Sequence, residues 1–85
     1  MPEAKIGVVQ HYFDHIDVAA INVTDGEITV GDTIHIKGHT SDFSTEVESI
    51  QIEHESVEKA AIGDSIGIKV PEKAREHDEV FKVTE

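Results

Sequence analysis

The 85-residue sequence contains no cysteine, which excludes a disulfide framework, a thiolate metal site and a cysteine nucleophile. No apolar run approaches the roughly 20 residues that a membrane-spanning helix requires. The N-terminus also lacks the basic and apolar regions of a signal peptide. The chain is too short for a two-domain enzyme. We therefore expect one soluble, cytoplasmic domain over residues 1–85, with an ordered core from about residue 5 to 84.

Basic residues are scarce, since seven Lys and Arg stand against 18 Asp and Glu and give a formal net charge of −11. This excess of negative charge argues against direct binding to nucleic acid or to an anionic membrane surface. The expected partners are therefore proteins, cations or basic surfaces. In the acidic cluster Glu46, Glu48, Glu53, Glu55 and Glu58, most residues alternate with apolar ones, which is typical of a solvated strand face.

Short segments rich in Val and Ile, separated by Gly-Asp or Asp-Gly, predict an all-β fold. The runs 6–13 and 18–23 predict a hairpin joined by residues 14–17. The first run is apolar on both faces, which favours a closed barrel. Residues 33–37 alternate cleanly between inward and outward positions. The expected core includes Ile34, Ile36, Val47, Ile50, Ile52, Ile66, Ile68 and Val70.

The middle of the chain is less regular. Residues 39–44 are polar around one phenylalanine and predict a loop. Residues 45–53 predict an antiparallel return strand with a bulge near Glu48 and Ser49. Residues 55–61 are too few for a stable helix and are expected to form a loop.

One internal repeat stands out. Val30 to Ile36 and Ile62 to Ile68 share the order apolar, Gly, Asp, hydroxyl, Ile, any, Ile. In each copy the glycine can turn the chain, and the aspartate can accept a hydrogen bond from a nearby backbone N–H. Residues 76–80 form an imperfect third copy with His77 in place of the glycine. If that position needs a positive φ, the histidine costs about 1 kcal/mol.

Each candidate catalytic or metal-binding motif has a simpler structural explanation. Gly63-Asp64-Ser65 superficially resembles a serine protease motif, but a strand-opening turn accounts for it. The six histidines include pairs spaced i, i+4, yet on a strand this spacing separates side chains by about 13 Å. No calcium-loop pattern is present. We expect no enzyme activity and assign no catalytic, cofactor-binding or metal-binding residue, so no cofactor is expected.

The order of several segments resembles the second domain of translation-factor GTPases such as elongation factor Tu. The resemblance rests on Gly7-Val8-Val9, Asp25-Gly26-Glu27-Ile28, Val30 to Ile34 and Ala61 to Gly67. It implies a closed, six-stranded, mainly antiparallel β-barrel of the reductase/isomerase/elongation factor type. The family's GTP site lies in a separate domain, and the chain lacks a lysine-bearing phosphate loop, so no GTP binding is expected. Related barrels also form the C-terminal portion of collagenase-like peptidases of the U32 type.

The leading hypothesis is a stand-alone, non-catalytic interaction module that binds a protein or ribosomal partner. One alternative is an accessory RNA-binding barrel in translation or RNA modification. Another is the detached equivalent of a U32-type peptidase C-terminal domain. A small metal-responsive protein that uses the histidines is a further possibility.

The partner surface is expected on the loops 39–43 and 71–77 and on the turn 14–17, because loops at the ends of a rigid barrel usually carry the binding residues. Phe43 has two interpretations, an exposed interface anchor or an aromatic plug that caps the core. The residues assigned to partner binding are His15, His39, Asp42, Phe43 and Arg75.

Overall fold

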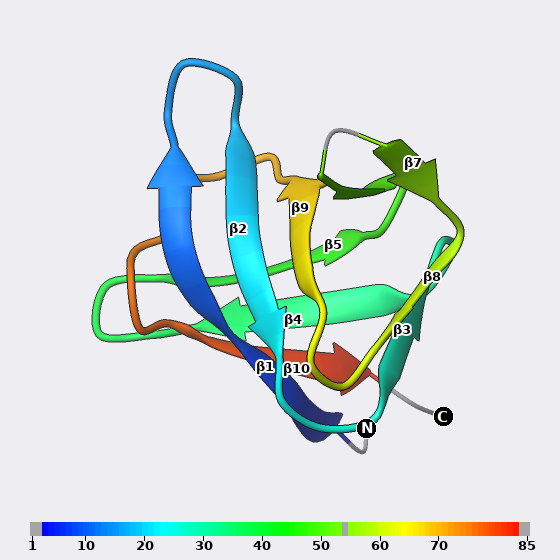
Figure 1. The fold of residues 1–85 in the computed structure, drawn as a ribbon. Helices are drawn as coiled ribbons and strands as arrows, with labels where there is room; N and C mark the ends of the chain where they lie inside the picture. The colour runs from blue at the N-terminus through cyan, green and yellow to red at the C-terminus, as the bar shows by residue number, and fades with distance from the viewer. Residues whose placement is uncertain (1–2, 54, 84–85) are drawn as a thin grey trace.

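The computed structural model describes residues 3–53 and 55–83, and within these ranges the protein is built from strands and turns without a helix (Figure 1). The described residues form ten strands. They are β1 (Glu3–Phe13), β2 (Val18–Val23), β3 (Glu27–Thr29), β4 (Thr33–Lys37), β5 (Asp42–Glu46), β6 (Ile50–Ile52), β7 (Glu55–Val57), β8 (Lys59–Ala61), β9 (Ser65–Lys69) and β10 (Glu79–Val83).

Eight strands form one sheet in the order β5-β4-β10-β1-β2-β9-β6-β7, while β3 and β8 form a separate two-stranded ribbon. All the pairs are antiparallel. In Figure 1, β1, β2 and β9 run upright, and β4 and β10 cross behind them. The long strand β1 joins the two parts because it pairs with both β2 and β10. The all-β, antiparallel prediction is confirmed.

The prediction of a closed six-stranded barrel is only partly met. The sheet order has two ends, β5 and β7, and no strand pairing joins them among residues 3–53 and 55–83. The number of strands also exceeds six, because residues 42–61 form four short strands, β5 to β8.

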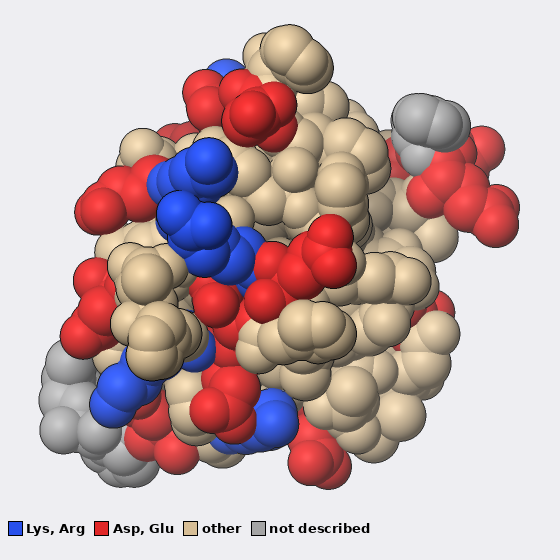
Figure 2. Space-filling view, turned by 90° about the vertical axis from the view of Figure 1, so that its left-hand side faces the viewer, with Lys and Arg blue, Asp and Glu red and all other residues tan. Residues whose placement is uncertain are grey.

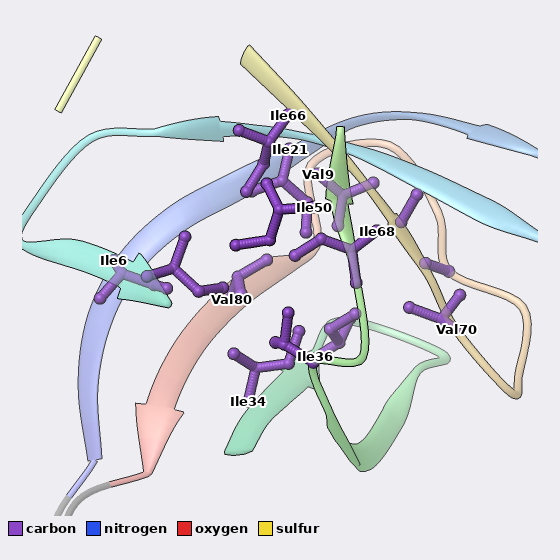
Figure 3. Packing of buried hydrophobic residues seen from close by; sticks show 14 of the residues in the cluster. Ile6, Val9, Ile21, Ile34, Ile36, Ile50, Ile66, Ile68, Val70 and Val80 are labelled. Atoms are coloured by element: carbon purple, nitrogen blue, oxygen red, sulfur yellow. The ribbon is translucent and has the colours of Figure 1, made fainter. Parts of the chain in front are cut away.

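The hydrophobic core lies between the crossing parts of the sheet, where side chains from β1, β2, β4, β6, β9 and β10 meet (Figure 3). Isoleucine dominates it, and Ile21, Ile34, Ile36, Ile50 and Ile68 are fully buried. Of the predicted core residues, seven are buried and Ile52 is only partly buried against the cluster. Alternation within single strands therefore identified most of the core.

Between residues 39 and 61 the structure corrects the sequence prediction. The expected loop 39–44 contains the start of β5, which pairs with β4 along its length. The expected return strand ends at Glu46 and resumes at Ile50, because β5 pairs with β4 whereas β6 pairs with β7 and β9. The chain thus changes partners near Glu48 and Ser49 instead of bulging within one ladder. The expected loop 55–61 contains β7 and β8.

The repeated motif forms three turns of one design. In each turn an aspartate carboxylate accepts a hydrogen bond from the backbone N–H three residues earlier. The aspartate's own N–H donates back to the carbonyl of that earlier residue. The third residue of each turn has a positive φ, as a type II turn requires. The three turns are Thr29–Asp32 with Gly31 at φ 100°, Ala61–Asp64 with Gly63 at φ 95°, and Arg75–Asp78 with His77 at φ 73°.

Each turn is also fixed to a neighbouring segment through a buried valine. The N–H of the positive-φ residue donates to the valine carbonyl, and the valine N–H donates to the carbonyl of the turn aspartate. The valines are Val47 for the first turn, Val23 for the second and Val9 for the third. The imperfect third copy is therefore a true member of the repeat, and its histidine occupies the position that glycine occupies elsewhere.

Replacing His77 by glycine is expected to raise the free energy of unfolding by about 1 kcal/mol, because glycine adopts a positive φ without the steric cost of a Cβ. Gly31→Ala and Gly63→Ala are the matched reverse changes. A Cβ at either position meets no atom within 4 Å, so each change should lower stability by about 1 kcal/mol through backbone strain alone. Urea denaturation of the three variants measures both effects. A His77→Gly variant less stable than the parent would contradict this account.

Candidate functional site

The five residues assigned to partner binding occupy different environments. His15 lies on the turn between β1 and β2, with its side chain 99% exposed, and His39 and Arg75 are also exposed. Asp42 is exposed and contacts the ring of His35. Nothing in the structure tests whether these residues bind a partner.

Phe43 is not the exposed anchor that one interpretation required. Phe43 is 7% exposed and belongs to the hydrophobic core. In the ladder between β4 and β5 it stands opposite Ile36, which is fully buried. The polar neighbours Asp42 and Ser44 point outward on the same strand, which is why the segment resembles a loop in sequence. The structure therefore supports the core-plug interpretation.

A polar hollow of about 430 Å³ lies between β1 and the segment that precedes β10. It brings Lys73 and Arg75 close to Tyr12 and His11, and His11 Nδ1 lies 3.5 Å from a carboxylate oxygen of Glu76. Figure 2 views the molecule from the left-hand side of Figure 1 and shows basic side chains gathered among acidic ones. The charges are mixed, and the hollow presents no nucleophile paired with a base.

A second, more apolar groove of about 330 Å³ lies on the outer side of β2, β6 and β9. Phe13 and Ile16 line it from the hairpin between β1 and β2, and they are 45% and 60% exposed. The sequence prediction missed this groove. The sequence did contain one indication of it. Ile16 is a large apolar residue in the polar turn 14–17, and the predicted core had no position for it. The full lining comprises Phe13, Ile16, Val18, Ala20, Gln51, Glu53, Ser65, Ile66 and Gly67.

His35 on β4 lies between two carboxylates. Its Nδ1 is 2.9 Å from Oε2 of Glu3 on β1, and its Nε2 contacts Oδ1 of Asp42 on β5. The Asp42 hydrogen bond raises the pKa of His35 above 6.5, with Glu3 adding to the effect and partial burial opposing it. The same contact lowers the pKa of Asp42. The protonated imidazole can donate to both acids at once, which links three strands.

The raised pKa of His35 predicts a pH dependence of stability. A group whose pKa is higher in the folded state stabilises the fold below its unfolded pKa, and this contribution is lost as pH rises through the folded value. The free energy of unfolding should therefore fall as the pH rises from about 6.5, the usual histidine pKa, through the higher pKa of the folded state. Asp42→Asn should bring the pKa of His35, followed by NMR titration, back toward 6.5. An unchanged titration in that variant would contradict the assignment.

The Gly-Asp-Ser motif makes structural contacts, and no metal cluster is found in the described part of the chain. Asp64 holds its turn by accepting from the Ala61 N–H, and the Ser65 hydroxyl donates to Oδ1 of Asn22 at 2.7 Å, so the Gly-Asp-Ser motif serves structure. Within residues 3–53 and 55–83, no three His, Asp or Glu side chains gather as metal ligands would. No helix in these ranges could span a membrane.

Comparison with known proteins points to peptidases. The chain is 39% identical over 72 residues to a collagenase of Porphyromonas gingivalis, a match that covers 84% of this chain and 20% of the collagenase. It is 37% identical over 82 residues to an uncharacterized protease of Methanocaldococcus jannaschii, covering 95% of this chain and 20% of that protease. The chain thus spans about a fifth of the length of these curated relatives. No family model matches the sequence.

A solved structure has the same fold. The C-terminal domain of a putative U32 peptidase from Geobacillus thermoleovorans superposes with a TM-score of 0.87 at 18% identity, covering 94% of this chain and 92% of that domain. The selenomethionine variant of the same domain gives a TM-score of 0.85. These findings overturn the resemblance to the second domain of translation factors, which rested on short Gly-Asp motifs that open strands. The alternative of a detached equivalent of a U32-type peptidase C-terminal domain fits the comparisons.

Proposed function

We propose that this chain is a non-catalytic accessory domain equivalent to the C-terminal domain of collagenase-like U32 peptidases. In this role it binds a protein partner, and the catalytic part of such a peptidase is the partner we favour. The observation that carries the proposal is the agreement of two comparisons. The curated relatives share more than a third of their aligned residues with this chain, and the U32 domain shares its fold over nearly the whole length.

The side chains of the described residues support a binding role. The Asp-Ser pair of the protease-like motif and His35 on β4 make structural contacts. Ser65 bonds to Asn22, Asp64 closes a turn, and His35 lies between two acids. Peptide hydrolysis by side chains needs a nucleophile and a base within hydrogen-bonding reach. The surface, by contrast, offers a polar hollow and an apolar groove.

The test uses the Methanocaldococcus jannaschii protease shortened by the 82-residue match. We expect the purified chain alone to leave gelatin and casein intact. Added to the shortened protease, it should bind with a measurable dissociation constant in calorimetry and should restore part of any activity lost on shortening. Proteolysis by the purified chain alone would overturn the non-catalytic assignment if inhibitors of contaminating proteases do not abolish it. Absence of binding to the shortened protease would overturn the choice of partner.

A further inference from the structure

The apolar groove is formed by small residues on the outer face of the sheet. Ala20 on β2 and Gly67 on β9 are register partners, so they lie side by side in the ladder. Gly67 is also paired with Gln51 on β6. A Cβ built on Gly67 would lie 3.3 Å from Cγ1 of Val18, so the glycine leaves space beside β2 that a side chain would fill. The base of the groove, at Ala20 and Gly67, is therefore recessed relative to the larger side chains on its two sides.

The walls of the groove have different chemistry. Phe13 and Ile16 provide an apolar wall, and their exposure is high for such large side chains at 45% and 60%. On the opposite side, Gln51 and Glu53 of the β6 segment provide a polar and acidic wall. Exposed apolar groups that converge on a depression are typical of a surface that a partner covers.

The charges around the groove select a basic occupant. Glu53 lines it, and the exposed turn that carries Ile16 also holds Asp14, His15 and Asp17. The nearest basic side chain by register is Lys69, which stands opposite Val18. Acidic groups thus outnumber basic ones here, as they do over the whole chain, whose net charge is −11. Complementary charge favours association with a cationic segment and disfavours an anionic one.

We propose that this groove binds an extended peptide segment of a partner protein, in which one bulky apolar side chain is flanked by Lys or Arg. The apolar side chain occupies the space above Ala20 and Gly67 and contacts Phe13 and Ile16. A flanking cation pairs with Glu53. The proposal goes beyond the accessory role in a peptidase, because the groove can bind such a segment whatever protein carries it, and the two proposals are tested by different experiments.

The probe is the peptide acetyl-Gly-Lys-Leu-Lys-Gly-amide, added to the isotope-labelled chain and followed by NMR. We expect saturable shifts at the amides of Ala20, Gln51 and Gly67. Ile16→Ser should weaken binding by about tenfold, since it removes an apolar contact that the peptide buries. Glu53→Gln should weaken binding by less, and added salt should reduce that difference. The matched control is Ile62→Ser, because Ile62 is 63% exposed and lies outside the groove.

Four results would overturn the proposal. Equal affinity for acetyl-Gly-Glu-Leu-Glu-Gly-amide would show that the charges do not select the occupant. Absence of saturable shifts, or equal loss of binding in Ile16→Ser and Ile62→Ser, would show that the groove is not the site. Self-association that disappears in Ile16→Ser, measured by analytical ultracentrifugation without peptide, would identify a second copy of the chain as the occupant. Unchanged melting temperatures in both serine variants verify that the fold is intact.

Discussion

Replacing Ile36 by alanine is expected to lower the free energy of unfolding by about 2 to 5 kcal/mol, the range for removing a large aliphatic side chain from a core. Ile36 is fully buried on β4. Its register partners are Val80 on β10 and Phe43 on β5, both of which are buried. The change therefore opens a cavity at the junction of three strands. Thermal unfolding should show a melting temperature lower by more than about 8 °C.

Ile62→Ala is the matched control for this experiment. It removes the same atoms from a residue that is 63% exposed. We expect its effect on the free energy of unfolding to remain within about 0.5 kcal/mol, as for most surface substitutions. Similar losses in the two variants would show that burial is not what makes Ile36 important.

Gly7→Ala should also destabilise the protein strongly, by about 3 kcal/mol, at the upper end of the range for overpacked interiors. A Cβ on Gly7 would lie 2.4 Å from the backbone carbonyl oxygen of Asn22 and 3.1 Å from Cγ2 of Ile21. Gly7 pairs with Val23 on β2 and with Val80 on β10. The added methyl group therefore pushes apart the strands that connect the two parts of the sheet, and a carbonyl cannot rotate away as a side chain can.

The comparison for Gly7 is Gly67→Ala in β9. There the nearest atom to the added Cβ is a side-chain methyl group of Val18 at 3.3 Å, which can shift by a small amount. Guanidinium denaturation should therefore find a much smaller loss, below about 1 kcal/mol. An equal loss in the two variants would show that the intrinsic cost of alanine in a strand, and not the contact with Asn22, decides the effect at Gly7.

Short-range sequence patterns predicted the structural features that depend on residues close together in the sequence. Ile34 and Ile36 alternate with polar residues, and both are buried as expected. The Gly-Asp repeat predicted its own hydrogen bonds, because the donor and the acceptor of each turn lie three residues apart. The alignment of His77 with two glycines raised the question of a positive φ at that position, and the structure has one.

Patterns failed where a distant strand decides the structure. Phe43 is surrounded by polar residues in sequence, and only its pairing with Ile36 shows that it faces the core. The segment 55–61 has weak strand character, but β7 pairs with β6 and β8 pairs with β3. The groove requires Ala20, Gly67 and Gln51 to lie together, and these come from three strands that are well separated along the chain. No short-range pattern carries that information.

The pairing of the first described strand with the last has a consequence for how the domain connects to other protein. Glu3 and Val83 are register partners in the ladder between β1 and β10, so the start of β1 and the end of β10 lie side by side (Figure 1). A flanking polypeptide attached at either end would leave the domain from nearly the same point. The same geometry allows the ends to be joined by a short linker and new ends to be opened in the exposed turn at residues 14–17, a circular permutant that should keep the fold.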